Sequence, residues 1–263
     1  MSVSPSGELA VWLEQLPALA FAFVLMLSRI GCACMLLPGI GEMEVPMPVR
    51  AGFALTMTIV LLPVLLPLMP DAPAGLMNSA LMVMAEIMTG LWLGWITRLV
   101  LLALPLAGQI AASMLGIANV LQPNAALGGQ STALSHLLGL AAPVAVLSSG
   151  LYVLPLTALE GSYHLIAPGS LLPAADGAMS AVDAVGGCFA VALRLAAPFV
   201  LAGTVWQVAL GLLARLVPQL QVYFAALPGQ ILGGVLLLAA LSAPLMLAWQ
   251  EHAATSFAAL PTP

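Results

Sequence analysis

The feature that most constrains this chain is the absence of charge across its middle. Between Arg98 and Glu160 there is no Asp, Glu, Lys or Arg. Within this interval, Gly108–Thr132 is rich in glycine, serine, asparagine and glutamine, whereas a loop in water normally also carries charged side chains. Polar backbone at membrane depth is tolerated only where protein or a water-filled cavity covers it. The stretch is therefore predicted to be a re-entrant or plug-like loop in a membrane channel with several helices.

Composition also indicates a membrane protein. Of the 263 residues, 62% are hydrophobic and 6% are charged, whereas a soluble domain carries about 25% charged residues. The formal net charge is −5, and all five basic residues are arginines. Without lysine or a basic cluster, the chain has little to offer a nucleic-acid backbone or an anionic lipid surface. The segment Met1–Leu16 lacks the positive start of a signal peptide, so we expect no cleaved leader.

The fold class predicted is an all-α membrane protein with about six apolar helices, because about 20 apolar residues are needed to cross a bilayer. Prolines should break or kink several of these helices, with Pro143 and Pro155 breaking the fourth. Residues 160–183 resemble a conventional aqueous loop by composition. The expected apolar runs are Leu16–Ile40, Ala51–Met69, Leu76–Leu106, Ala133–Leu159, Gly187–Val217 and Ile231–Trp249.

Two charged residues lie deep inside apolar runs. Arg29 would cost roughly 2.5–3.5 kcal/mol at the centre of a lone membrane helix. It should therefore face a protein interior, an acidic partner or backbone carbonyls, unless the helix starts late enough for the side chain to reach the interface. For the same reason Glu86 should be paired, protonated or directed at a cavity.

Two helical faces carry small and polar residues at intervals of four. On the first face, Gly90 and Gly94 form a small-xxx-small pair that lets another backbone approach closely. This contact could join subunits or gate a conduit, or it could be ordinary helix packing, and the sequence favours neither. The first face consists of Glu86, Gly90, Gly94 and Arg98, and the second of Gly203, Gln207, Gly211 and Arg215.

Enzyme signatures are missing. There is no His-Glu-x-x-His zinc motif and no lysine to complete a phosphate-binding loop. Cys32 and Cys34 point to opposite faces of a helix, which disfavours a shared metal. Ser135 and His136 are adjacent and do not face each other, so they do not form a catalytic dyad. We expect no catalytic, cofactor or metal site; a secondary transporter with broken helices is the rival reading.

Several short patterns are spread over the chain: Arg29 and Pro38; Val45 and Pro46; Val49 and Arg50; Glu86, Gly90 and Gly94; Gly108 and Gly116 ahead of Gln122 and Pro123; Arg194 and Pro198; Arg215, Pro218 and Gln219; and Val222–Phe224. Together they resemble the FliR family of flagellar biosynthetic proteins, which is related to the SctT components of injectisomes. The sequence departs from that family's usual pattern at Gln221, where asparagine is common, and at Gln230, where lysine is frequent.

The resemblance implies a non-enzymatic subunit of the type III protein export gate in the bacterial inner membrane, within the flagellar basal body. Its expected partners are FliP-like and FliQ-like subunits in a helical assembly, FlhB-like and FlhA-like export components, membrane lipid and unfolded export substrates. Residues 1–160 would resemble FliP and residues 161–263 the FliQ hairpin, together forming one structural unit. An injectisome subunit of the SctT type is the nearest alternative.

The resemblance and the patterns described above together suggest roles for particular residues. The loop at 108–132 would be the plug, with glycines that permit movement, apolar side chains that seal and amides that satisfy backbone groups. The plug and gate residues are Gly108, Ile110, Met114, Leu115, Gly116, Ile117, Asn119, Gln122 and Pro123. The assembly and packing residues are Arg29, Arg50, Glu86, Gly90, Gly94, Arg194, Pro198, Gly203, Gly211, Arg215 and Pro218. For Glu86 and the arginines, proton carriage is the alternative to a role in assembly.

Overall fold

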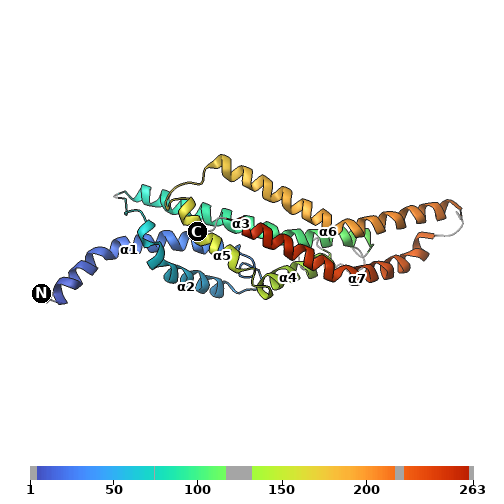
Figure 1. The fold of residues 1–263 in the computed structure, drawn as a ribbon, viewed down its shortest axis with the longest axis horizontal. Helices are drawn as coiled ribbons and strands as arrows, with labels where there is room; N and C mark the ends of the chain where they lie inside the picture. Colours follow the sequence, from blue (N-terminus) through green and yellow to red (C-terminus); the bar gives the residue numbers. More distant parts are fainter. Residues whose placement is uncertain (1–4, 74, 117–131, 217–221, 261–263) are drawn as a thin grey trace. The chain divides into compact units, whose positions relative to one another are not determined.

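The structure is a computed structural model in which the described backbone is entirely helix and connecting turn, without strands (Figure 1). It describes residues 5–73, 75–116, 132–216 and 222–260, and side chains over 16–73, 75–116, 132–173, 175–216 and 226–260. The all-α prediction is confirmed. The elements are α1 (Pro5–Cys34), α2 (Met47–Leu65), the short 3-10 helix η1 (Leu66–Leu68), α3 (Leu76–Met114), α4 (Ala133–Ser148), α5 (Val153–Leu165), α6 (Ala174–Leu216) and α7 (Val222–Ala258).

Five of the described helices are long and apolar enough to cross a membrane. The helices α4 and α5 together make a sixth candidate span, broken between them. The prediction of about six apolar, partly broken helices is thus confirmed. The five unbroken candidate spans are Leu16–Cys34, Met47–Leu68, Leu76–Met114, Ala175–Leu216 and Ala226–Ala258.

The predicted break in the fourth run is placed wrongly. Helix α4 continues through Pro143, and the chain breaks instead between Ser148 and Val153, where Gly150 has a φ of +77°. That conformation favours glycine because it has no Cβ. Pro155 lies in the first turn of α5, where its missing N–H has no helical partner to lose.

Two further boundaries differ from the sequence prediction. The region 160–183 is mostly helical: α5 continues to Leu165 and α6 begins at Ala174, so only a short connection separates them. Asp176 lies in the first turn of α6, where the positive end of the helix dipole favours an acidic side chain. Helix α3 continues to Met114, so Gly108–Met114, expected as loop, is the end of a helix.

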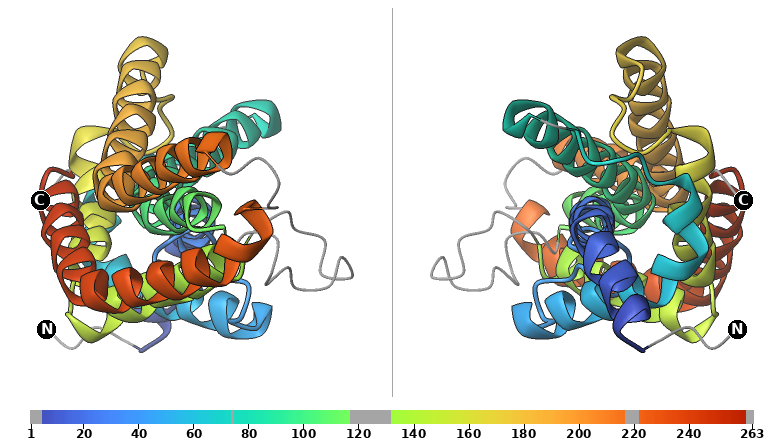
Figure 2. Two further views of the ribbon diagram at one scale, coloured as in Figure 1. Left: turned by 90° about the vertical axis from the view of Figure 1, so that its right-hand side faces the viewer. Right: turned by 90° about the vertical axis from the view of Figure 1, so that its left-hand side faces the viewer.

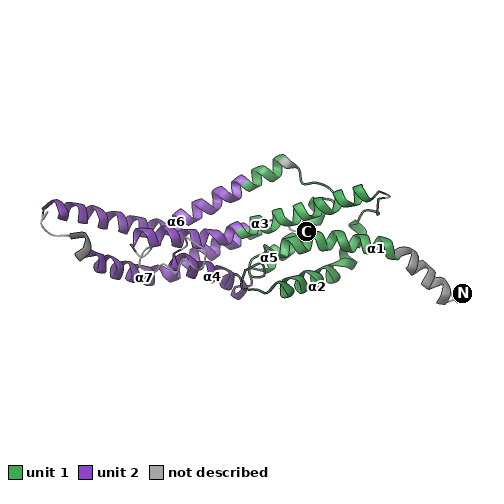
Figure 3. Cartoon of the chain, turned by 180° about the vertical axis from the view of Figure 1, so that it is seen from behind, with its two compact units in different colours: residues 1–98, 152–181, 257–263 green, residues 99–151, 182–256 purple. Residues whose placement is uncertain are grey.

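The first of two compact units contains residues 1–98, 152–181 and 257–263 (Figure 3). Within it, α2 folds back alongside α1, as Figures 1 and 2 show. Its apolar core includes Met26 and Ile30 of α1, Leu65 of α2, Leu93 of α3 and Tyr163 of α5. The unit therefore brings α5 onto the N-terminal helices despite their separation in sequence.

The second unit contains residues 99–151 and 182–256, hence the end of α3, all of α4 and most of α6 and α7. Here α7 packs on α3 through the fully buried Trp249, whose Nε1 donates a hydrogen bond to the Val100 carbonyl at 3.2 Å. In α4, Ser135 donates its hydroxyl to the Pro105 carbonyl of α3 at 2.9 Å. The two compact units are defined by packing within the chain. The predicted FliP-like and FliQ-like parts are defined by resemblance to other proteins, so the division at residue 160 stays a prediction.

Candidate functional site

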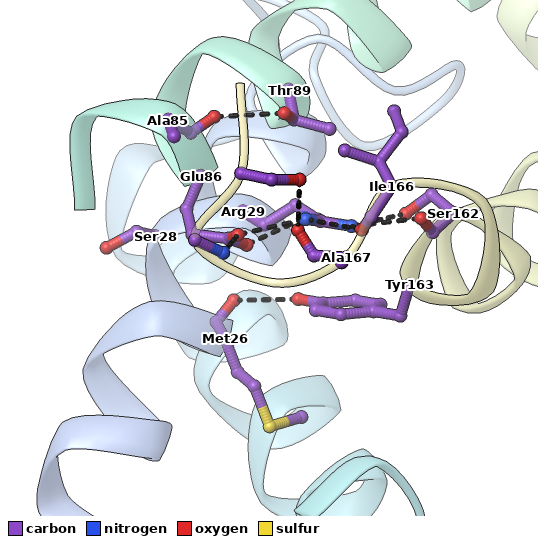
Figure 4. Close-up of polar contacts among 12 residues, drawn as sticks. Met26, Ser28, Arg29, Ala85, Glu86, Thr89, Ser162, Tyr163, Ile166 and Ala167 are labelled. Carbon is purple, nitrogen blue, oxygen red and sulfur yellow. Dashed lines mark hydrogen bonds and ion pairs between the residues drawn. The ribbon is translucent and has the colours of Figure 1, made fainter. Parts of the chain in front are cut away.

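A buried ion pair connects α1 and α3 in the first unit (Figure 4). Arg29 of α1 donates from Nε to Glu86 Oε2 at 2.7 Å and from Nη2 to Oε1 at 2.9 Å. Both side chains have no exposed surface. Parallel N–H···O bonds of this kind fix the geometry as well as the energy of an arginine–carboxylate pair.

The remaining donors of Arg29 are used at the C-terminal end of α5. Its Nη1 donates to the Ser162 carbonyl at 3.1 Å, and its Nη2 to the Ile166 carbonyl at 3.2 Å. The last carbonyls of a helix carry the negative end of its dipole, and the Ser162 carbonyl accepts from Arg29 in addition to the Ile166 N–H. The guanidinium therefore joins three helices, and a buried charge that would otherwise be costly has an acceptor for each of its nitrogens.

Glu86 receives a third hydrogen bond from the connection between α5 and α6. The Gly169 amide donates to Glu86 Oε1 at 2.7 Å, in a turn where Gly169 has a φ of +79°. A Cβ at this position would also collide with the Met82 side chain. The Tyr163 ring stacks on the Arg29 guanidinium at 4.2 Å and donates its hydroxyl to the Met26 carbonyl at 3.4 Å.

The structure decides between the alternatives for both charges. Arg29 faces the interior, an acidic partner and backbone carbonyls together, so the reading in which it reaches the membrane interface is wrong. Glu86 is paired, as expected. The sequence contained no sign that these two residues pair with each other across 57 positions. It also gave no signal for Tyr163 or Gly169, whose contribution depends on where α5 packs.

The rest of the first glycine face packs against α1 and the turn that follows it. A Cβ on Gly90 would collide with the Arg29 carbonyl, and one on Gly94 would lie 2.9 Å from the Ala33 carbonyl. Arg98 continues the face and pairs with Glu42 at 3.1 Å. Of the two readings left open, helix packing within one chain is what the described residues show for this face.

Arg50, near the start of α2, has a local role. Its Nε donates to the Val45 carbonyl at 2.9 Å, across the turn that precedes the helix. This contact joins the first turn of α2 to the short connection between α1 and α2. The assignment of Arg50 to assembly therefore stays a prediction.

The helical part of the predicted plug is packed inside the second unit. Gly108 lies where α3 meets α4, and a Cβ there would be 2.8 Å from the Leu138 side chain and 3.1 Å from Ser135 Cα. Ile110 and Met114 are half-buried, and Leu115 is 4% exposed. Gly116 ends this part with a φ of +72°. The predicted plug residues outside the described part of the chain are Ile117, Asn119, Gln122 and Pro123.

The second small-residue face has a different environment. Gly203 is buried against Met114, but Gln207, Gly211 and Arg215 are exposed, and a Cβ on Gly211 would meet nothing within 4 Å. Arg194 and Pro198 are also exposed on α6. Most of this face is thus open within the single chain. Pro218 lies outside the described residues.

Among the described residues, no group of three His, Cys, Asp or Glu side chains is placed to hold a metal. The buried ion pair is also an unsuitable metal site, because three N–H donors already occupy the Glu86 carboxylate, two from the Arg29 guanidinium and one from Gly169. The fold and this site define an integral membrane protein of broken helices in which a fully buried arginine and glutamate neutralise each other within the chain.

Comparison with known proteins shows which family of membrane proteins this chain resembles. Residues 20–256 match the family described as bacterial export proteins, family 1. The chain is 29% identical to the flagellar biosynthetic protein FliR of Caulobacter vibrioides over 88% of this chain and 92% of that protein. It is 28% identical to FliR of Bacillus subtilis, covering 80% and 82% of the two chains, and 26% identical to FliR of Escherichia coli, covering 92% and 90%.

The chain belongs to the FliR family of bacterial export proteins and is a subunit of the flagellar export apparatus. The resemblance predicted from the sequence is therefore confirmed. The comparisons do not favour the injectisome or small-solute transporter alternatives.

Proposed function

We propose that this subunit forms and closes part of the conduit through which unfolded flagellar proteins cross the bacterial inner membrane, and that it does so without catalysing a reaction. The observation that carries the proposal is the end of α3. There a long membrane helix ends in apolar Met114 and Leu115, followed by Gly116 in a glycine-favouring conformation, at the start of an uncharged polar segment. Apolar constrictions exclude water and ions, and a glycine permits the change of direction.

Uneven burial of the helices supports assembly with other subunits. In the most apolar part of α3, 50% of the residues are buried within the chain, but the share is 11% in α7 and 17% in α2. On α6 and α7, the exposed side chains include Leu201, Val205, Leu212, Leu232 and Leu236. We assign these faces to FliP-like and FliQ-like subunits and to lipid, with FlhB-like and FlhA-like components joining the larger apparatus.

The Arg29–Glu86 pair serves as a structural connection in this proposal. Each oxygen of Glu86 already accepts a hydrogen bond from Arg29, and both side chains are fully buried. A carboxylate that exchanges protons with a conduit needs access to water and a change of partners. The observed geometry supports a fixed link between α1, α3 and α5 instead.

The test is ion conductance of the reconstituted export-gate complex. Deletion of Gly116–Asn119 should leave assembly intact and increase ion leakage, because the apolar end of α3 would no longer continue into the plug. Deletion of a segment of equal length near the C-terminus, residues 259–262, is the matched control. Unchanged conductance of a fully assembled deletion complex would refute the plug.

The proposed partners require a separate measurement. Co-purification of the chain with FliP-like and FliQ-like subunits, followed by mass measurement of the intact complex, should give a single assembly with a defined composition. An isolated, well-behaved monomer that moves a small solute by itself would overturn the conduit proposal.

A further inference from the structure

The last turn of α3 is enclosed by α6 and α7, all within the second unit (Figure 3). On the α6 side, Gly203 lies directly against Met114: a Cβ on Gly203 would be 2.9 Å from the Met114 carbonyl oxygen and 3.0 Å from Met114 Cβ. Part of this contact is to backbone, which cannot move aside as a flexible side chain can. The contact therefore requires a residue without a side chain at position 203.

On the α7 side, one polar and one apolar contact reach the same turn. Gln230 donates from Nε2 to the Met114 carbonyl at 3.2 Å. One turn later along α7, a Cβ on Gly234 would be 3.0 Å from Leu115 Cβ, so Leu115 packs on a surface without a side chain. Gly116, with its φ of +72°, turns the chain beside the Gln230 amide: a Cβ on Gly116 would be 3.0 Å from Nε2.

The hydrogen bond from Gln230 pairs a carbonyl at the end of a helix. Met114 is the last residue of α3, and the final carbonyls of a helix have no N–H partner four residues further along. Left unpaired in apolar surroundings, such a carbonyl carries a desolvation cost. The Gln230 amide supplies a donor to this carbonyl from another helix.

We infer that Gln230 is a positioning residue: its side-chain amide caps α3 and, together with Gly203 and Gly234, fixes the place and direction in which the chain leaves that helix. The Met114–Gly116 turn thereby becomes mechanically coupled to α7. This inference rests on the proposed function, in which the same turn begins the plug. A shift of α7 relative to α3 withdraws the donor from Met114 and releases the turn.

Substitutions at position 230 separate capping from simple packing. Gln230→Glu has nearly the same shape but loses the N–H donor and places a negative group against a carbonyl oxygen. Gln230→Lys changes the shape but keeps a donor. A capping role predicts that the lysine variant resembles the wild type and the glutamate variant does not, whereas a packing role predicts the reverse.

The experiment measures amide hydrogen exchange of the peptide spanning Ile110–Gly116 in the complete complex, held in lipid nanodiscs. Gln230→Glu should accelerate exchange on the order of tenfold, while Gln230→Lys should leave it near the wild-type rate. Gln250→Glu, the same change elsewhere on α7, is the matched control and should have no effect. If the glutamate complex does not assemble, Gln230→Leu, which removes the donor without adding charge, replaces it.

Ion conductance of the same complexes distinguishes this inference from the proposed function. Faster exchange together with increased leakage supports both. Faster exchange with unchanged leakage supports the cap and refutes the plug. Exchange that is unchanged in the Gln230→Glu complex, or accelerated equally by the lysine variant, overturns the role of Gln230 whatever the conductance.

Discussion

The small-residue faces of α3 and α6 look alike in sequence, but in the folded chain the α3 face is packed and most of the α6 face is exposed. The α3 face meets α1 so closely that Gly90 touches the backbone of Arg29. Most of the α6 face is exposed, and space is open around Gly211. Each face ends in an arginine, but Arg98 has Glu42 as a partner within the chain whereas Arg215 is exposed.

This difference shows what a repeat of small residues at intervals of four does and does not determine. The pattern permits close approach of another backbone, but it does not specify which chain supplies that backbone. On α3 the partner is α1. On α6 we propose that it is another subunit, because arginine and glycine on an apolar helix are otherwise exposed without compensation. Variants of the two faces should therefore differ in stability and in assembly.

The largest effect is expected at the buried ion pair. Arg29→Met should destabilise the isolated chain by about 3–5 kcal/mol, because Glu86 would remain buried without its cationic partner. The double variant Arg29→Met with Glu86→Leu should recover most of this loss, because it leaves no unpaired charge. Thermal unfolding of the purified chains in detergent measures the effect.

The control for this pair is Glu44→Leu, which removes an exposed carboxylate from the turn between α1 and α2. It should change stability little, since surface substitutions usually stay within about 0.5 kcal/mol. If the double variant were no more stable than Arg29→Met alone, the pair would not be the reason for the loss.

A smaller effect is expected from adding one methyl group to each glycine face. Gly90→Ala should destabilise the isolated chain by about 1–3 kcal/mol, because the new Cβ meets backbone. Gly211→Ala should instead stabilise it by up to about 1 kcal/mol, since alanine favours a helix and the space is open. Opposite signs in a chemical-denaturation series would confirm the contrast; equal losses at both sites would contradict it.

The Arg98–Glu42 pair should contribute less again. Its side chains are 27% and 16% exposed, so solvent screens the attraction. Arg98→Gln should therefore cost about 0.2–1 kcal/mol, and the cost should shrink as salt is raised. Arg50→Gln serves as a control, because Arg50 bonds to a carbonyl within its own turn. A cost that does not depend on salt would point to packing instead of charge.

Much of this fold followed from composition and apolar run length, because about 20 apolar residues must form a helix in a bilayer. Helix ends were predicted less well: α4 passes through Pro143, and the chain breaks instead near Gly150, a glycine with positive φ that was not used as a helix-end signal. The need for a partner at Arg29 was predictable from its cost in lipid. Its identity was not, because Glu86 and the end of α5 reach it only through tertiary packing.

The effect of Arg194 should change sign between the isolated chain and the complex. Arg194 is exposed near the middle of the apolar helix α6, where an arginine facing lipid costs roughly 2.5–3.5 kcal/mol on insertion scales. Arg194→Ala should therefore leave the isolated chain as stable as the wild type or more stable. In the presence of FliP-like and FliQ-like subunits, the same change should lower the yield of complex several-fold. The reason is that the partner subunit packed on this part of α6 would lose its contact with the Arg194 charge.

Arg194→Lys separates charge from shape in this measurement. Lysine keeps the positive charge but not the planar, bidentate hydrogen bonding of arginine. Partial recovery of complex yield would indicate a charged partner, and no recovery would indicate a specific hydrogen-bonded contact. A normal yield with Arg194→Ala would remove this part of α6 from the proposed interface and leave the open glycine face of α6 to lipid.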